Sequence, residues 1–208
     1  MYNTRSAVLL LFFNRRASAI AVMNQIAKVR PKKVYLSCDG ARNVSELERV
    51  IELRETIEKS IDWECEIFTN YFDENKGCRN AVSLGITWFF KNEEEGIILE
   101  DDCVPSISFF RFCDEMLEVY RDDLRVWNIG GYCPPYLESS GFSYSFSLFT
   151  HIWGWASWAN RWNFYDPDLN TLDNYVNQNL VLFPFKTLNQ KRLALLFEVK
   201  AGSVDTWD

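Results

Sequence analysis

Short apolar runs alternate with amphipathic stretches over the first 130 residues of the chain. The apolar runs are too short for ordinary helices and are bounded by Gly, Pro or charged residues, so they predict strands buried on both faces. The stretches between them carry apolar residues at helical spacing and predict helices. Predicted strands cover residues 7–13, 33–38, 64–69, 96–100 and 125–129, and predicted helices cover 17–29, 45–60, 75–90 and 106–120.

This alternation predicts an α/β fold with a mostly parallel central sheet flanked by helices. Right-handed crossovers bring the carboxyl ends of such strands to one edge of the sheet. Three groups of polar residues follow predicted strands: Asn14-Arg15, Asp39 and the triplet Glu100-Asp101-Asp102. We therefore expect these side chains to line one crevice.

Two local patterns refine the predicted helices. Ser45 is followed three residues later by Glu48, which is the spacing of a capping box and predicts a helix start. In the third helix, the stripe formed by Ala81, Leu84, Gly85 and Trp88 predicts the side that faces the sheet.

The pattern changes after residue 130, where we expect a small antiparallel extension of the sheet. Residues 142–150 alternate polar and apolar side chains, as an edge or antiparallel strand does. Residues 151–158 are densely aromatic, and helices are predicted over 172–179 and 189–200. A chain of 208 residues is most simply one domain.

The acidic triplet Glu100-Asp101-Asp102 ends a strand predicted to be buried. Three adjacent carboxylates at such a place repel one another and lose solvation, so a compensating charge is needed. Mg²⁺ or Mn²⁺ would provide it, because these ions prefer oxygen ligands. The simpler interpretation is an acidic turn between strand and helix, with Ser106 capping the following helix.

Composition narrows the possible partners and locations. A net charge of -7 argues against nucleic acid and anionic membranes as partners. The six Cys residues are widely spaced, and most lie in predicted apolar strands or helices, which indicates small buried side chains in a reducing compartment. A single His argues against a zinc site. The apolar run at 7–13 is too short to span a membrane and precedes the basic pair Arg15-Arg16, unlike a signal peptide. We expect a cytoplasmic protein without a transmembrane segment.

The ordered set of motifs resembles the GT-A glycosyltransferases, and more narrowly the N-acetylglucosaminyltransferase I type and its bacterial relatives. The resemblance covers most of the chain and includes Phe109-Phe110 on the predicted helix after the triplet. The triplet Glu100-Asp101-Asp102 itself corresponds to that family's DXD motif. The motifs are Phe13-Asn14-Arg15, Leu36-Ser37-Cys38-Asp39-Gly40, Glu100-Asp101-Asp102, Gly154-Trp155 with Trp158 and Trp162, and Trp207-Asp208.

The resemblance implies one GT-A-like, Rossmann-type domain over residues 1–208. Residues 1–130 would form the nucleotide-binding half, and residues 131–208 the acceptor-side half. We expect the second half to be truncated, because the chain stops at Asp208 without a closing strand.

The resemblance also implies a reaction, the transfer of a sugar from a nucleotide diphosphate, with a UDP-sugar favoured, to an acceptor hydroxyl with inversion. Asp102 would hold Mn²⁺ or Mg²⁺ at the diphosphate, with Glu100 and Asp101 near the ribose and the waters of the metal. Asp39 would accept a hydrogen bond from the base, and Arg15 would lie at the base or a phosphate.

An inverting transferase needs a carboxylate that takes the proton of the acceptor hydroxyl. The family places this base in a Trp-Asp context, which points to Asp208, with Asp205 as the alternate.

Each assignment has a structural alternative. Asp39 is also compatible with an ordinary Asp-Gly turn, Arg15 with a solvated helix start and Asp208 with a surface tail. Trp155 and Trp158 are more typical of a core than of a sugar-binding platform.

Two other functions stay open at this point. A nucleotidyl- or phosphotransferase would use the same triplet, although a Gly-rich phosphate loop is missing from the sequence. A non-catalytic carbohydrate-binding module would use the Trp-rich segment as a stacking surface.

Overall fold

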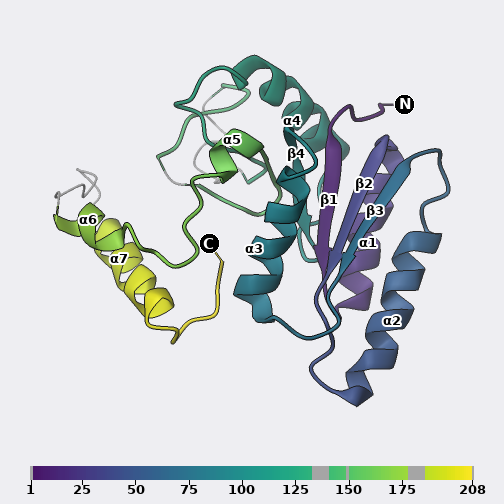
Figure 1. Ribbon diagram of the computed structural model, residues 1–208. Helices are drawn as coiled ribbons and strands as arrows, with labels where there is room; N and C mark the ends of the chain where they lie inside the picture. Colours follow the sequence, from purple (N-terminus) through teal and green to yellow (C-terminus); the bar gives the residue numbers. More distant parts are fainter. Residues whose placement is uncertain (1, 133–140, 149, 178–185, 208) are drawn as a thin grey trace.

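The computed structural model describes residues 2–132, 141–148, 150–177 and 186–207. Strands and helices alternate through the first half of the chain, as predicted, and shorter elements follow (Figure 1). The first half contains β1 (Ala7–Phe12), α1 (Arg16–Val29), β2 (Lys33–Cys38), α2 (Val44–Lys59), β3 (Glu66–Tyr71), α3 (Gly77–Phe90), β4 (Glu95–Glu100) and α4 (Ile107–Tyr120). The second half contains β5 (Ile129–Gly130), β6 (Trp155–Trp158), α5 (Ala159–Trp162), α6 (Leu172–Asn177) and α7 (Lys186–Lys200).

The strands form one six-stranded sheet in the order β3-β2-β1-β4-β6-β5. Strands β1 to β4 are parallel, whereas β6 runs antiparallel to both β4 and β5. β1 lies between β2 and β4, and its Leu10 is in register with Leu36 on one side and Leu99 on the other. All six residues of β1 are buried, as its unbroken apolar run predicts. The α/β fold with an antiparallel extension is therefore confirmed.

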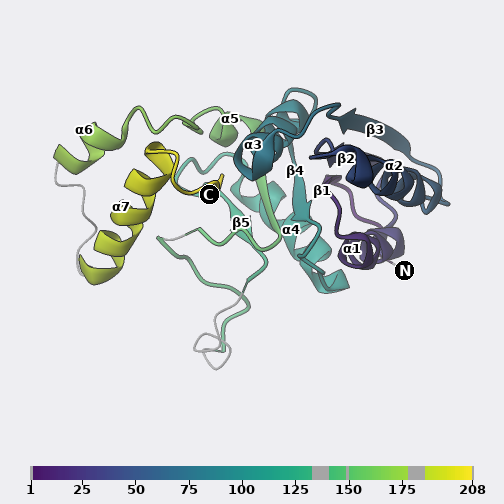
Figure 2. The same ribbon diagram turned by 90° about the horizontal axis from the view of Figure 1, so that it is seen from below.

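Helices cover both faces of the sheet, with α3 on one side and α1 and α4 on the other (Figure 2). Alternate residues of β1 point to opposite faces, so Val8 and Leu10 pack with one set of helices and Leu9 with the other. The first core contains buried side chains of α1, α2 and α4, and the second contains Ile86 and Phe89 of α3 with Trp155 and Trp207.

The second helix starts with a different cap from the predicted one. Asn43 is the N-cap, because its side chain accepts a hydrogen bond from the Glu46 N–H, while Ser45 already lies inside the helix. Glu46, rather than Glu48, reaches back to the Arg42 N–H at 2.9 Å. The predicted capping box is therefore wrong by two residues, since the Asn43 oxygen lies closer to the first free N–H groups.

The inward face of α3 also differs from the predicted stripe at one residue. Leu84 is 47% exposed, whereas Ala81 and Gly85 are buried. Gly85 decides the orientation, because a Cβ there would lie 2.7 Å from Ser37 Oγ and 2.8 Å from Leu11 Cδ2. The missing side chain lets α3 approach the sheet along this line, and Leu84 turns to solvent.

Strand boundaries are less accurate than strand existence. β3 lies two residues later than predicted, and the strand predicted over 125–129 is reduced to β5. The described residues of 142–150 form no strand, and Trp155–Trp158 provides the antiparallel strand instead. All four residues of β6 are buried, so this strand carries no polar and apolar alternation to reveal it.

The cysteines only partly follow the prediction of buried side chains. Cys38 and Cys113 are buried, Cys65 and Cys103 are partly exposed, and Cys78 is exposed, which contradicts the prediction there. Cys133 lies outside the described residues. None of the helices in the described ranges is long and apolar enough to cross a membrane. The cytoplasmic location stays a prediction.

Candidate functional site

The strand order reverses between β1 and β4. From β1 the chain builds the sheet outward to β2 and β3, and then returns to the other side of β1 with β4. Open α/β sheets bind ligands outside the carboxyl ends of the strands at such a reversal. Here the end of β1 leads into Phe13, Asn14 and Arg15, and the end of β4 leads into Asp101 and Asp102.

Arg15 joins the two aspartates at this point. Its Nη1 atom donates to Asp101 Oδ1 at 3.3 Å and to Asp102 Oδ2 at 2.7 Å. Asp101 is buried and also accepts a hydrogen bond from the Phe13 N–H at 3.3 Å. Burial raises the pKa of Asp101, against the lowering effect of the Arg15 charge, and the charge of Asp101 is the largest cause that raises the pKa of Arg15. Arg15 therefore lies at the start of α1 with a side chain that is 60% exposed, as its structural alternative states, and pairs with both aspartates as well.

Asp102 and Glu100 differ from Asp101 in their surroundings. The Asp102 side chain is 56% exposed, while Asp101 between them is buried. Glu100, the last residue of β4, is half-buried in register with Leu11 of β1. The triplet thus provides one well-exposed carboxylate at the mouth of the crevice.

Asp39 lies one strand away, at the end of β2. Its Oδ1 accepts hydrogen bonds from the N–H groups of Gly40 and Lys76, and its Oδ2 accepts one from Asn75 Nδ2, all at 2.8 Å. Burial raises the pKa of Asp39, and the backbone N–H groups of Lys76, Gly40 and Gly77 oppose that rise. The residue therefore fastens the start of α3 to the end of β2, which is more than an ordinary Asp-Gly turn does.

The end of β1 connects Asp39 with the triplet. The Phe12 carbonyl accepts a hydrogen bond from the Asp39 N–H at 3.4 Å, and the next residue, Phe13, donates to Asp101. Arg15, Asp101 and Asp102 are thus in direct contact, and Asp39 lies across β1 on the same edge. A hollow of about 370 Å³, lined by Tyr71, Phe72, Asp73, Glu74 and Lys76, adjoins the Asp39 side.

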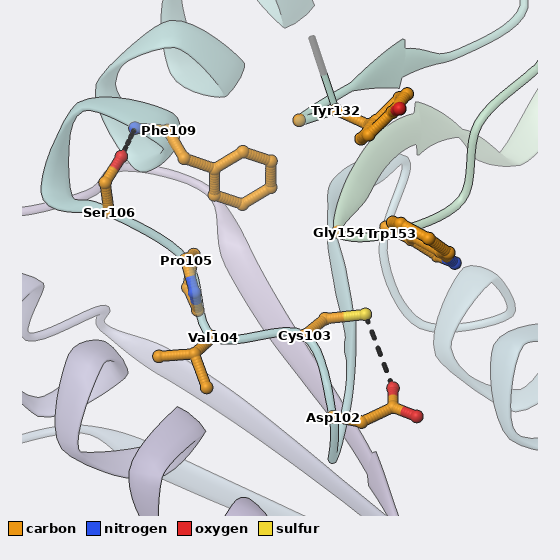
Figure 3. Close-up of a pocket in the computed structure, with 10 residues that line it drawn as sticks. Asp102, Cys103, Val104, Pro105, Ser106, Phe109, Tyr132, Trp153 and Gly154 are labelled. Carbon is orange, nitrogen blue, oxygen red and sulfur yellow. Dashed lines mark hydrogen bonds between the residues drawn. The ribbon is translucent and has the colours of Figure 1, made fainter. Parts of the chain in front are cut away.

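A larger pocket of about 500 Å³ opens on the other side of Asp102 (Figure 3). It is built by the loop after β4, the first turn of α4, and the segments that follow β5 and precede β6. Its lining is Asp102, Cys103, Val104, Pro105, Ser106, Phe109, Gly131, Tyr132, Trp153 and Gly154.

Two polar groups of this pocket have clear local roles. Ser106 caps α4 as predicted, because its hydroxyl accepts a hydrogen bond from the Phe109 N–H at 3.3 Å. The Cys103 thiol donates to Asp102 Oδ1 at 3.6 Å. Burial, together with the negative charge of Asp102, raises the pKa of Cys103 to about 12, so Cys103 is a neutral thiol rather than a nucleophilic thiolate.

Trp155 and Trp158 belong to the core, in agreement with their structural interpretation. Both are almost fully buried. Trp155 stacks on Trp207 with ring centroids 5.9 Å apart, and the guanidinium of Arg161 lies 4.2 Å from the Trp158 ring centroid. They do not form a sugar platform.

Of the two candidate bases, only Asp205 lies in the described part of the chain, and Asp208 lies outside it. Asp205 caps the start of α3, where its carboxylate accepts from the Cys78 N–H at 3.0 Å and the Arg79 N–H at 3.1 Å. The hydrogen-bond partners of Asp205 therefore belong to α3 and not to the acidic triplet.

The carboxylates that could contact a cation are few, and Arg15 already pairs with Asp101 and Asp102. Within the described ranges, no group of three or more His, Cys, Asp or Glu side chains converges in a way that could hold a metal ion. Mg²⁺ typically uses only one or two protein carboxylates and completes its coordination with waters and substrate phosphates. The exposed Asp102 carboxylate suits that mode, with the ligand providing most of the oxygens.

Two features of the site were not predicted from the sequence. Arg15 was expected to contact the ligand, but its salt bridges to Asp101 and Asp102 follow only from the pairing of β1 with β4. The pocket residues Tyr132 and Trp153 were not singled out, and the one available signal was a Trp directly before Gly154 in a segment without helical or strand periodicity.

No family model matches the chain, and a search of curated proteins found no match either.

Proposed function

We propose that this protein is a metal-dependent glycosyltransferase of the GT-A type, similar to the N-acetylglucosaminyltransferase I group. It would transfer a sugar from a nucleotide diphosphate, with a UDP-sugar favoured, to an acceptor hydroxyl with inversion. One observation carries the proposal: Arg15, Asp101 and Asp102 meet where the strand order reverses, next to a pocket of about 500 Å³. A nucleotide diphosphate needs positive charge at such a place, and a transferase needs room beside it for an acceptor.

Each residue of this site would have a separate role in binding the donor. Asp102 would hold Mn²⁺ or Mg²⁺, which stabilises the negative charge that develops on the leaving diphosphate. Asp101 is anchored by the Phe13 N–H and positions Arg15, whose charge attracts the diphosphate. Asp39 would hydrogen-bond the base beside the hollow at Tyr71–Lys76, and Glu100 would lie near the ribose.

Proton removal from the acceptor is assigned to Asp208, with Asp205 as the alternate. The capping bonds of Asp205 to α3 favour Asp208, because both carboxylate oxygens of Asp205 already accept backbone N–H groups of that helix. Asp208 directly follows Trp207, which is buried against Trp155.

Linked binding of nucleotide and metal tests the proposal. We expect UDP to raise the melting temperature only with Mn²⁺ present, and a ligand at one hundred times its Kd adds about 2.7 kcal/mol of stability. Asp102→Asn should abolish this shift, because it removes the exposed charged ligand. Asp62→Asn is the matched control, since Asp62 is an exposed aspartate before β3, at the opposite edge of the sheet.

The outcomes separate the candidate functions. Manganese-dependent UDP binding that survives Asp102→Asn would refute the metal assignment. Stabilisation by saccharides without any response to UDP and Mn²⁺ would favour a non-catalytic carbohydrate-binding module, a candidate that the exposed Trp153 ring in the pocket keeps open.

A further inference from the structure

The pocket beside Asp102 contains an exposed tryptophan that the donor site does not use. Trp153 is 69% exposed, although the chain buries Trp155, Trp158 and Trp207 almost completely. Burying a large apolar side chain stabilises a protein, so an indole left in solvent forgoes that stabilisation. A ligand that covers the ring would recover it.

Backbone geometry at Gly154 keeps this ring outside the core. In an uninterrupted strand, Trp153 and Trp155 would lie on the same face. Gly154 has φ +72°, a conformation that side chains disfavour, and it breaks the alternation directly before β6. Trp155 consequently enters the core while Trp153 lines the pocket.

A second ring orients Trp153. Tyr132 meets it edge-on with ring centroids 5.3 Å apart, and His151 packs on Tyr132 at 5.0 Å. In Figure 3 the rings of Tyr132 and Trp153 lie across the hollow from Phe109, with Asp102 nearby. The pocket thus presents a positioned aromatic surface together with polar groups such as Ser106.

We propose that this pocket binds a pyranose ring of the acceptor saccharide, with Trp153 as its stacking platform. A pyranose has one face rich in C–H groups and a rim of hydroxyls. The aromatic rings match the face, and the Ser106 hydroxyl can accept a hydrogen bond from the rim. The volume of about 500 Å³ is within the range of small-ligand pockets.

The assignment to the acceptor rests on the proposed function, and the position of Asp102 supports it. Asp102 both contacts Arg15 and lines the pocket. A hydroxyl of a sugar stacked on Trp153 would therefore lie next to the position expected for the donor diphosphate. Transfer requires that adjacency, because reacting atoms must approach to about 3–3.5 Å.

Saturation-transfer NMR with methyl glycosides of glucose, galactose, mannose and N-acetylglucosamine tests this site. We expect at least one glycoside to bind, and Trp153→Ala to weaken it by about tenfold. Trp127→Ala is the matched control, because Trp127 is 50% exposed, packs on Phe164 and is not part of the pocket lining. The UDP and Mn²⁺ melting shift should stay unchanged in both variants.

The results distinguish this site from the proposed function. A wild-type protein that binds UDP with Mn²⁺ but none of the glycosides would overturn the acceptor site and leave the transferase proposal intact. Glycoside binding that depends on Trp153 without any nucleotide binding would keep the saccharide pocket and refute the transferase. Equal losses in the Trp153 and Trp127 variants would place the sugar elsewhere. Preference for tetramethylammonium over every glycoside would identify a cation site instead.

Discussion

Asp114 shows how a single buried carboxylate secures one edge of the fold. It lies on α4 and accepts hydrogen bonds from the hydroxyls of Tyr2, Thr4 and Ser6 and from the N–H groups of Arg5 and Ser6. Burial alone would raise its pKa, but these donors outweigh burial and lower the pKa of Asp114. The charged form therefore ties the segment before β1 to α4.

Replacing that charge should destabilise the protein strongly. We expect Asp114→Asn to lower the free energy of unfolding by about 2–4 kcal/mol, because several buried donors lose a charged acceptor. Glu118→Gln is the control on the same helix, since its pair with Arg5 is exposed and such pairs contribute about 0–1 kcal/mol. Urea unfolding measures both changes.

The pH dependence gives an independent check on Asp114. A lowered pKa in the folded state means that this stabilisation is present above the unfolded pKa of about 3.9 and is lost as the pH falls below it. Unfolding of Asp114→Asn should consequently depend less on pH than the wild type between about pH 5 and 3. Identical acid dependence in the two proteins would show that Asp114 is not the stabilising group.

Individual site residues could be predicted only where their position follows from strand order. Asp101 and Asp102 were predicted to line one crevice with Arg15, because the carboxyl ends of parallel strands meet at one edge of the sheet. Their salt bridges to Arg15 were not predicted, because they depend on the pairing of β1 with β4. The sequence did not show that Trp153 is exposed while Trp155 and Trp158 are buried, since this difference in exposure depends on the positive φ of Gly154. Asp205 was treated as a possible base, but its partners come from α3, far away in the sequence.

At the scale of an element, the packing of α3 on the sheet depends on Gly85. We expect Gly85→Val to cost about 1–3 kcal/mol, because the new side chain would overlap Ser37 and Leu11 and force α3 outward. Leu84→Ala is the adjacent control, and an exposed substitution of this kind should change stability by about 0.5 kcal/mol or less. Denaturant unfolding compares the two, and a tolerated Gly85→Val would show that α3 can shift at little cost.

Elements were predictable where hydrophobic periodicity was strong and local. β1, β2 and β4 are unbroken buried runs between charged or glycine residues, so their pattern is clear. β6 was missed because its Trp and Ser side chains are buried on both faces through pairing with β4 and β5, which are distant in sequence. The described residues of 142–150 alternate in the sequence but form no ladder, since the place beside β4 is taken by β6.

At the scale of the whole molecule, the last described residues connect the two halves of the chain. Trp207 is buried against Trp155 and Trp162, and its carbonyl accepts a hydrogen bond from Tyr165 Oη at 2.7 Å. Two residues earlier, Asp205 caps α3, whose preceding loop is bonded to Asp39. Asp205 and Trp207 thus connect the last described residues with the segment that holds Asp39.

This link yields a prediction that separates a capping role of Asp205 from a catalytic one. Asp205→Asn keeps one acceptor oxygen for the two N–H groups of α3, so it should lose less stability than Asp205→Ala, which removes both acceptors and should lose about 0.5–2 kcal/mol. With Asp208 as the base, Asp205→Asn also keeps its rate of UDP release from UDP-sugars in the presence of acceptor. Asp208→Asn should lose the rate contribution of a general base, about 10²–10⁴-fold. If a folded Asp205→Asn variant lost about 10²–10⁴-fold in rate instead, the general base would be Asp205. The start of α3 would then have to release its cap during each turnover.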